Sequence, residues 1–258
     1  MIAHIKEQSR WRLLLAAAML IFSIGLLCLL IYREYAVLHA YQWRLRWQYI
    51  IGGFGVLLPG LLLAAAVWAD LMHTLGSQVR FLDHVRYYAI SHLGRRLPGT
   101  LWYVAGRSYF YKQHNASLTL IATASGIELL ISVVSGALVT MLFAVSMFKA
   151  LPLTSLLSLV LILILGLPFM HPQVIDWILR RMKLPVPQLL RYTELARWLI
   201  GYALIWIIGG VVFFLIINAV TALAYIHLPF VIAIWSLVGT LSITVFFYPA
   251  ILVLPKSV

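Results

Sequence analysis

The sequence predicts an all-α integral membrane protein, a polytopic helix bundle that forms a single domain over residues 1–258. Apolar residues make up 64% of the chain, whereas soluble domains contain about 45–50%. Charged residues make up 10%, against about 25% in soluble domains, and the mean hydropathy is +1.00. A soluble core cannot hide this much apolar surface, and a disordered chain would not carry it. The cell membrane, inner or plasma, is therefore the expected location.

Six apolar segments are long enough to cross a bilayer, for which a helix needs about 20 mostly apolar residues. They are residues 13–32, 47–69, 118–148, 151–170, 198–226 and 229–254. The first follows Lys6, Arg10 and Arg12 as a signal peptide would. Its apolar run exceeds the roughly 7–15 residues of such a peptide, and no A-x-A cleavage site follows. We therefore expect it to be a retained span.

Three features modify this simple plan of six helices. Pro59-Gly60 lies in the middle of the second segment and predicts a kink. The third segment is so long that it must tilt, bend or leave the bilayer. Before the fifth segment, the apolar residues of QVIDWILRRM recur at helical spacing, which predicts a helix lying along the membrane interface.

The distribution of Lys and Arg predicts the orientation. With both termini in the cytoplasm, fifteen of the 19 basic residues fall on the cytoplasmic side. The same bias, together with an anionic leaflet, accounts for the net charge of +12 without a nucleic-acid partner. No motif that reads DNA or RNA is present.

The sequence offers no complete catalytic constellation, and this favours a function other than that of an enzyme. The single cysteine, Cys28, lies in an apolar run, so neither a disulfide framework nor a thiolate metal site is expected. The histidines show no metal-binding spacing, and neither a Walker loop nor a nucleophile elbow occurs. We expect no metal and no cofactor.

The most unusual segment covers residues 90–112, between the second and third spans. Basic and aromatic side chains surround a Pro-Gly break that interrupts any helix. The candidate lipid-headgroup ligands are Arg95, Arg96, Pro98, Gly99, Trp102, Arg107 and Lys112. Arginine binds phosphate bidentately, and Trp and Tyr favour the headgroup zone. One interpretation is a re-entrant or interfacial helical pair that holds a lipid phosphate. The alternative is a plain cytoplasmic loop whose arginines only set the topology.

Two polar residues lie inside predicted spans. A carboxylate at the centre of a membrane helix costs about 2.5–3.5 kcal/mol on insertion scales, so Glu128 must be protonated, paired or next to a water-filled cavity. Arg107 is the expected partner if the preceding segment folds back into the bilayer. Otherwise the span begins near Glu128, which then lies at the interface. Asn218 is expected to bridge two helices.

The run LGRRLPGTLWYVAGRSYFYKQ, followed by LIATASGIELLISVVSGALV, resembles the lysylphosphatidylglycerol synthase transmembrane family, which is flippase-like. The matching positions are Leu93, Gly94, Arg95, Leu97, Pro98, Gly99, Trp102, Gly106, Arg107 and Glu128. Arg96 and Thr100 depart from the family pattern, and the family's C-terminal Pro-Gly-rich segment has no counterpart here.

The resemblance implies that the protein translocates or binds an anionic or polyprenyl-phosphate lipid headgroup, with membrane lipids as its partners. The catalytic domain of the synthases is not part of the resemblance. The alternative is a membrane subunit or accessory scaffold of an enzyme that makes lipid-linked glycans or aminoacyl-lipids, with a synthase as partner.

Overall fold

Helices form every regular element of the part of the chain that the structure describes. The computed structural model describes residues 21–22, 24–40, 44–94, 102–114, 116–144, 157, 160–161, 163–164, 166–168, 170–181 and 190–252. Within these ranges no strand occurs, and the prediction of an all-α protein is confirmed.

Four of the described helices are long and apolar enough to cross a membrane, which makes this a membrane protein with four candidate spans. They are α3 (Trp47–Thr74), α6 (Leu118–Ala144), α9 (Tyr192–Val220) and α10 (Leu228–Leu252), which follows the short 3-10 helix η2 (Tyr225–His227). The predicted number of six is not confirmed. Most of the predicted spans 13–32 and 151–170 lies outside the described residues, and the apolar helix Ile24–Arg33 is shorter than a span.

The bounds of two spans differ from the predicted ones. Helix α9 begins at Tyr192 rather than at residue 198, because the side chain of Glu194 accepts a hydrogen bond from the Arg191 N–H at 2.8 Å and caps the first turn. It ends at Val220 rather than at residue 226, where Thr221 turns extended. Helix α3 runs five residues beyond the predicted end and continues through Pro59 as a single helix.

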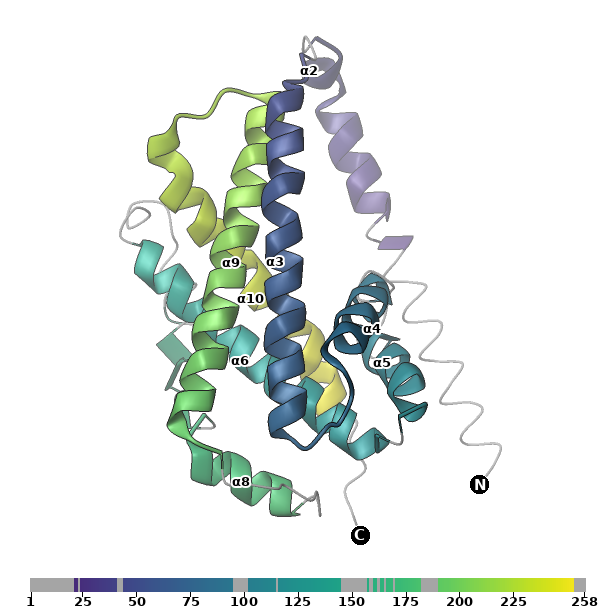
Figure 1. Ribbon diagram of the computed structural model, residues 1–258. Helices are drawn as coiled ribbons and strands as arrows, with labels where there is room; N and C mark the ends of the chain where they lie inside the picture. The colour runs from purple at the N-terminus through teal and green to yellow at the C-terminus, as the bar shows by residue number, and fades with distance from the viewer. Residues whose placement is uncertain are drawn as a thin grey trace, which may run out of the picture.

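Helices α3 and α9 pack antiparallel over most of their length, as Figure 1 shows. Their contacts recur every seven residues: Gly53 faces Leu215, Gly60 faces Ile208, and Val67 faces Gly201. Each pair sets one glycine against one branched side chain. Without a Cβ at these positions the two backbones approach closely, as at many interfaces between membrane helices.

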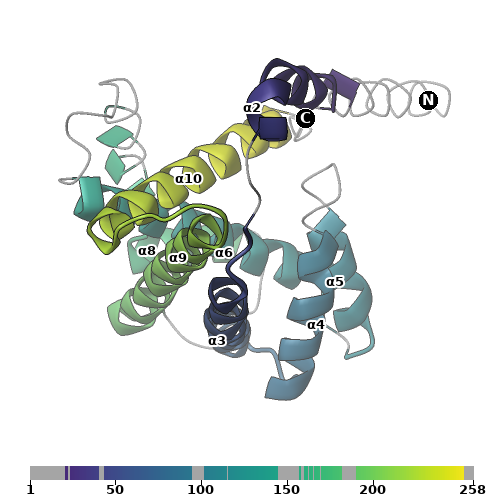
Figure 2. The same cartoon turned by 90° about the horizontal axis from the view of Figure 1, so that it is seen from above.

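Helix α6 is the most enclosed of the four candidate spans. Its second half packs against α9 and α10, and its first half packs against a hairpin of two shorter helices, α4 (Phe81–Gly94) and α5 (Trp102–Lys112). The view from above shows the hairpin and α10 on different sides of the α3–α6–α9 group (Figure 2). Helix α6 therefore contacts both the hairpin and the other long helices, while α3 packs against the hairpin through α4.

The hairpin lies beside the half of α3 that precedes the connection to α4 (Figure 1). In that connection Gly76 has a φ of 94°, a backbone conformation that glycine adopts without strain. Residues 95–101, between α4 and α5, lie outside the described residues. Two further helices are α2 (Tyr35–Ala40) and α8 (Pro172–Arg181), and the latter confirms the helix predicted before the fifth span.

Candidate functional site

An ion pair between Arg107 of α5 and Glu128 of α6 lies at the centre of the hairpin contact. Arg107 Nη1 is 2.5 Å from Glu128 Oε2, and Nη2 is 3.3 Å from Oε1. Both side chains are 0% exposed. Helix α6 begins at Leu118, so Glu128 lies about 15 Å along its axis and not at its first turn. The predicted pairing of Arg107 with Glu128 is confirmed, and the helix that carries Glu128 begins ten residues before it.

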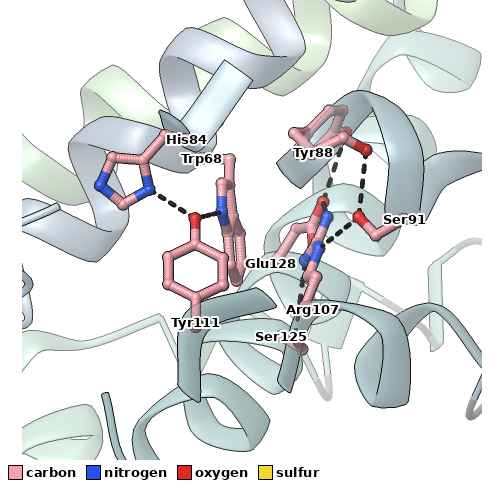
Figure 3. A network of polar contacts seen from close by, with 8 residues as sticks. All are labelled: Trp68, His84, Tyr88, Ser91, Arg107, Tyr111, Ser125 and Glu128. Carbon is pink, nitrogen blue, oxygen red and sulfur yellow. Dashed lines mark hydrogen bonds and ion pairs between the residues drawn. The ribbon is translucent and has the colours of Figure 1, made fainter. Parts of the chain in front are cut away.

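Neutral hydroxyl groups complete the surroundings of the pair. Arg107 Nε donates to Ser91 Oγ at 3.3 Å, and Nη1 reaches Ser125 Oγ at 3.5 Å. The Tyr88 hydroxyl donates to Glu128 Oε1 at 3.5 Å. These hydroxyl groups come from α4 and α6, and Figure 3 shows them around the ion pair.

Two aromatic rings enclose the guanidinium group of Arg107. Its Cζ lies 3.7 Å from the centroid of the Trp68 ring and 4.9 Å from that of Tyr88. A cation over an aromatic face gains about 0.5–1 kcal/mol at exposed sites and about 2 kcal/mol when it is desolvated. Trp68 is on α3, so this one arginine connects the hairpin to both α3 and α6.

A separate chain of hydrogen bonds begins at the indole N–H of Trp68 (Figure 3). Trp68 Nε1–H donates to the Tyr111 hydroxyl oxygen at 2.8 Å, and that oxygen lies 2.5 Å from His84 Nδ1. We assign the Tyr111 hydrogen to this contact, which makes Nδ1 the acceptor and leaves the imidazole proton on Nε2. Burial raises the pKa of Tyr111, so both side chains are neutral near pH 7.

The imidazole of His84 is fully buried, and burial is the main reason that its pKa is lowered to about 4. The neighbouring His73 lowers it further, and His114 does so more weakly. The Val79 carbonyl and Asp83 act in the opposite direction. These groups come from α3, from its connection to α4, from α4 and from the turn after α5, and burial outweighs the two that favour the charged imidazole.

This lowered pKa predicts acid sensitivity of the hairpin. Below pH 6.5 the unfolded chain binds a proton at His84, while the folded chain does so only near pH 4. The stabilisation is therefore complete above pH 6.5 and is lost as the pH falls toward 4. Thermal unfolding in detergent at pH 7, 6 and 5 measures it. On acidification, the melting temperature of the wild type should fall further than that of His84→Phe. An equal fall in both proteins would contradict the prediction.

The predicted headgroup ligands are only partly within the described residues. Arg95, Arg96, Pro98 and Gly99 lie outside them, as does the side chain of Trp102, whose backbone begins α5. Lys112 is exposed at the end of α5, whereas Arg107 is enclosed by protein groups.

Asn218 lies apart from the ion pair, in the last turn of α9. Its Nδ2 donates to the Phe214 carbonyl at 3.1 Å, and its Oδ1 accepts from the Leu223 N–H at 3.1 Å. Both bonds are local, so in this structure the amide ends the helix, whereas we expected it to bridge two spans.

The sequence did not point to the aromatic and hydroxyl partners of the pair. Trp68 and Tyr88 are two of many aromatic residues in the chain, and nothing in their spacing distinguishes them. Ser125 carries one usable signal, because it precedes Glu128 by three residues and so shares its helix face. Among the described residues no cluster of three or more His, Cys, Asp or Glu side chains could hold a metal ion.

Comparisons of the chain with protein-family models, with curated proteins and with solved structures find no match. The functional argument therefore rests on the membrane architecture and on the chemistry of this site.

Proposed function

We propose that the chain is a flippase-like protein of the cell (inner) membrane that binds an anionic or polyprenyl-phosphate lipid headgroup at the α4–α5 hairpin and carries it across the bilayer. The observation that supports this most directly is the Arg107–Glu128 pair, which holds the base of the hairpin inside the helix bundle. The resemblance of residues 90–136 to the lysylphosphatidylglycerol synthase transmembrane family adds to it.

The exposed basic side chains supply the attraction for an anionic lipid. The helices and turns that carry most of these side chains lie at the lower end of the bundle in Figure 1. The basic side chains on them are Arg80, Arg86, Lys112, Arg180, Arg181, Arg191 and Arg197. By the positive-inside rule we assign this end to the cytoplasm, and the distribution of Lys and Arg along the sequence assigns both termini to the same side. Each basic side chain near an anionic leaflet contributes about 1 kcal/mol of attraction.

In the proposed cycle, Glu128 occupies the place of the headgroup. Its two oxygens meet the guanidinium fork as two phosphate oxygens would. Leaving either charge buried without a partner costs about 3–5 kcal/mol. The phosphate must therefore replace the carboxylate as it leaves, and the carboxylate must return when the lipid departs.

An observation at the other end of the molecule favours a second candidate function, an accessory scaffold or membrane subunit of a lipid-linked glycan or aminoacyl-lipid synthesis enzyme. Every described side chain of the apolar helix Ile24–Arg33 is exposed. A membrane helix of a partner subunit would pack against these side chains in place of lipid. Copurification of a synthase at one-to-one stoichiometry, without lipid translocation by the chain alone, would favour this function.

Translocation of a labelled lipid in proteoliposomes tests the leading proposal. We expect the wild type to move an anionic phospholipid faster than phosphatidylcholine. The double variant Arg107→Ala/Glu128→Ala should be slower by about tenfold or more, equivalent to about 1.4 kcal/mol in barrier height. Arg33→Ala/Glu34→Ala, which removes an exposed ion pair away from the hairpin and from the basic side chains named above, is the matched control and should keep the wild-type rate. Equal rates for all three proteins would overturn the proposal, provided that each elutes as a folded species.

A further inference from the structure

A row of small and polar residues continues from the ion pair along α6. Ser125, Glu128, Ser132, Gly136 and Thr140 recur every three or four residues and so share one face of the helix. At 1.5 Å per residue the row is about 22 Å long, against about 30 Å for the hydrocarbon core of a bilayer. It therefore covers most of the depth of the membrane.

Two buried hydroxyl groups, one turn apart, share a face of α10, the helix that packs against α6. Ser236 and Thr240 are both 0% exposed. Neither Ser236 Oγ nor Thr240 Oγ1 has a hydrogen-bond partner in the part of the chain that the structure describes. Thr240 Oγ1 lies so close to Gly136 that a Cβ there would overlap with it. The Thr240 hydroxyl is therefore aimed at the row on α6.

Close packing alone does not explain these hydroxyls. Small residues are common where membrane helices approach, but alanine would allow the same approach. A buried hydroxyl left without a partner costs about 1–3 kcal/mol. Thr140 and Thr244 avoid this cost by donating to the carbonyls of Gly136 and Thr240, at 2.8 and 2.9 Å. Ser236 and Thr240 make no such bond, so their hydroxyls are available to another molecule.

Trp206 of α9 closes the row in this structure. Its indole ring lies in a slot between Gly136 of α6 and Gly239 of α10, because a Cβ at either glycine would overlap with the ring. Its Nε1–H donates to the Ser132 carbonyl at 2.8 Å. The ring therefore fills the space that a polar molecule would need between α6 and α10.

We propose that the α6 row, with Ser236 and Thr240, is the passage along which the hydroxylated headgroup of an anionic lipid crosses the bilayer, and that Trp206 is its gate. This inference rests on the proposed lipid-translocating function. The phosphate is held at the Arg107 end, while the hydroxyls of the passage replace the water that a glycerol or sugar group loses. An outward swing of Trp206 gives that group access to Thr240.

Cysteine accessibility tests the passage. In a Cys28→Ser background, Ser236→Cys and Thr240→Cys are treated with a small water-soluble methanethiosulfonate in vesicles containing phosphatidylglycerol. Val231→Cys is the control, because Val231 is also buried on α10 but lies on the opposite face of the helix from Thr240. We expect positions 236 and 240 to react about tenfold faster or more, a difference of about 1.4 kcal/mol, and Trp206→Ala to accelerate position 240 further. Reaction as slow as that of position 231, with and without Trp206, would overturn the passage.

Transport separates failure of the passage from failure of the proposed function. Ser236→Ala/Thr240→Val removes both hydroxyls with almost no change in volume. It should slow translocation of labelled phosphatidylglycerol at least severalfold while leaving its binding at the hairpin unchanged. Wild-type speed in this variant would overturn the passage alone. Absence of translocation by the wild type would overturn the proposed function and the passage with it.

Discussion

Glu128→Leu is expected to lower the free energy of unfolding by about 3–5 kcal/mol, because it leaves the guanidinium group of Arg107 buried without a counter-charge. Arg107→Met should have a similar effect, since it strands the carboxylate and also empties the slot between Trp68 and Tyr88. Reversible unfolding in mixed detergent micelles measures both variants.

The double variant Arg107→Met/Glu128→Leu is the informative companion. Apolar residues of similar size often replace a buried ion pair with little net loss, because the cost of desolvating two charges disappears with them. We therefore expect a loss well below the sum of the single losses. Asp176→Ala/Arg180→Ala is the control for an exposed pair and should change the free energy of unfolding by at most about 1 kcal/mol. Single variants that behave like this control would show that the pair does not hold the hairpin.

Gly210→Ala is expected to give the second large loss, at the contact between α9 and α10. A Cβ at this position would lie 2.7 Å from the Cα of Ile232. The obstacle is a backbone atom of another helix, so no side-chain rotation can relieve the overlap, and α10 must move away from α9. Overpacking of this kind costs about 1–3 kcal/mol. The melting temperature in detergent should fall accordingly.

Gly126→Ala is the matched control within α6, because a Cβ there meets no atom within 4 Å. Alanine is a better helix former than glycine by about 0.5–1 kcal/mol, so this variant should be neutral or slightly more stable. If both variants lower stability equally, the effect comes from helix flexibility, and the proposed close contact of α9 with α10 is wrong.

Part of the candidate site was predictable from the sequence because charge inside a membrane is so expensive. Glu128 stands in an apolar segment, and a buried carboxylate requires a partner. A Pro-Gly break earlier in the chain allows the intervening segment to fold back, which made Arg107 the expected partner. The structure confirms the pair. It also shows that Arg107 has no exposed surface, which no property of the neighbouring sequence indicates.

The rest of the site depends on which faces of the helices meet. In a soluble protein, an apolar stripe shows the buried face of a helix. In a membrane both lipid and protein interior are apolar, so a spanning helix such as α6 has no such stripe. The sequence therefore could not show that Trp68 and Tyr88 enclose Arg107, or that Gly136 and Gly239 form the slot for Trp206.

By itself, the sequence determined the membrane class, the helical architecture, the four spans that the structure describes, the helix α8 and the need of Glu128 for a cation. Length, hydropathy and the cost of buried charge are properties of local segments, and they act before any helix meets another. Only the tertiary structure decided that one arginine joins three helices and that Trp206 lies in a slot between α6 and α10. Those outcomes depend on contacts between segments far apart in the chain, where steric fit and hydrogen-bond geometry select among faces of equal hydropathy.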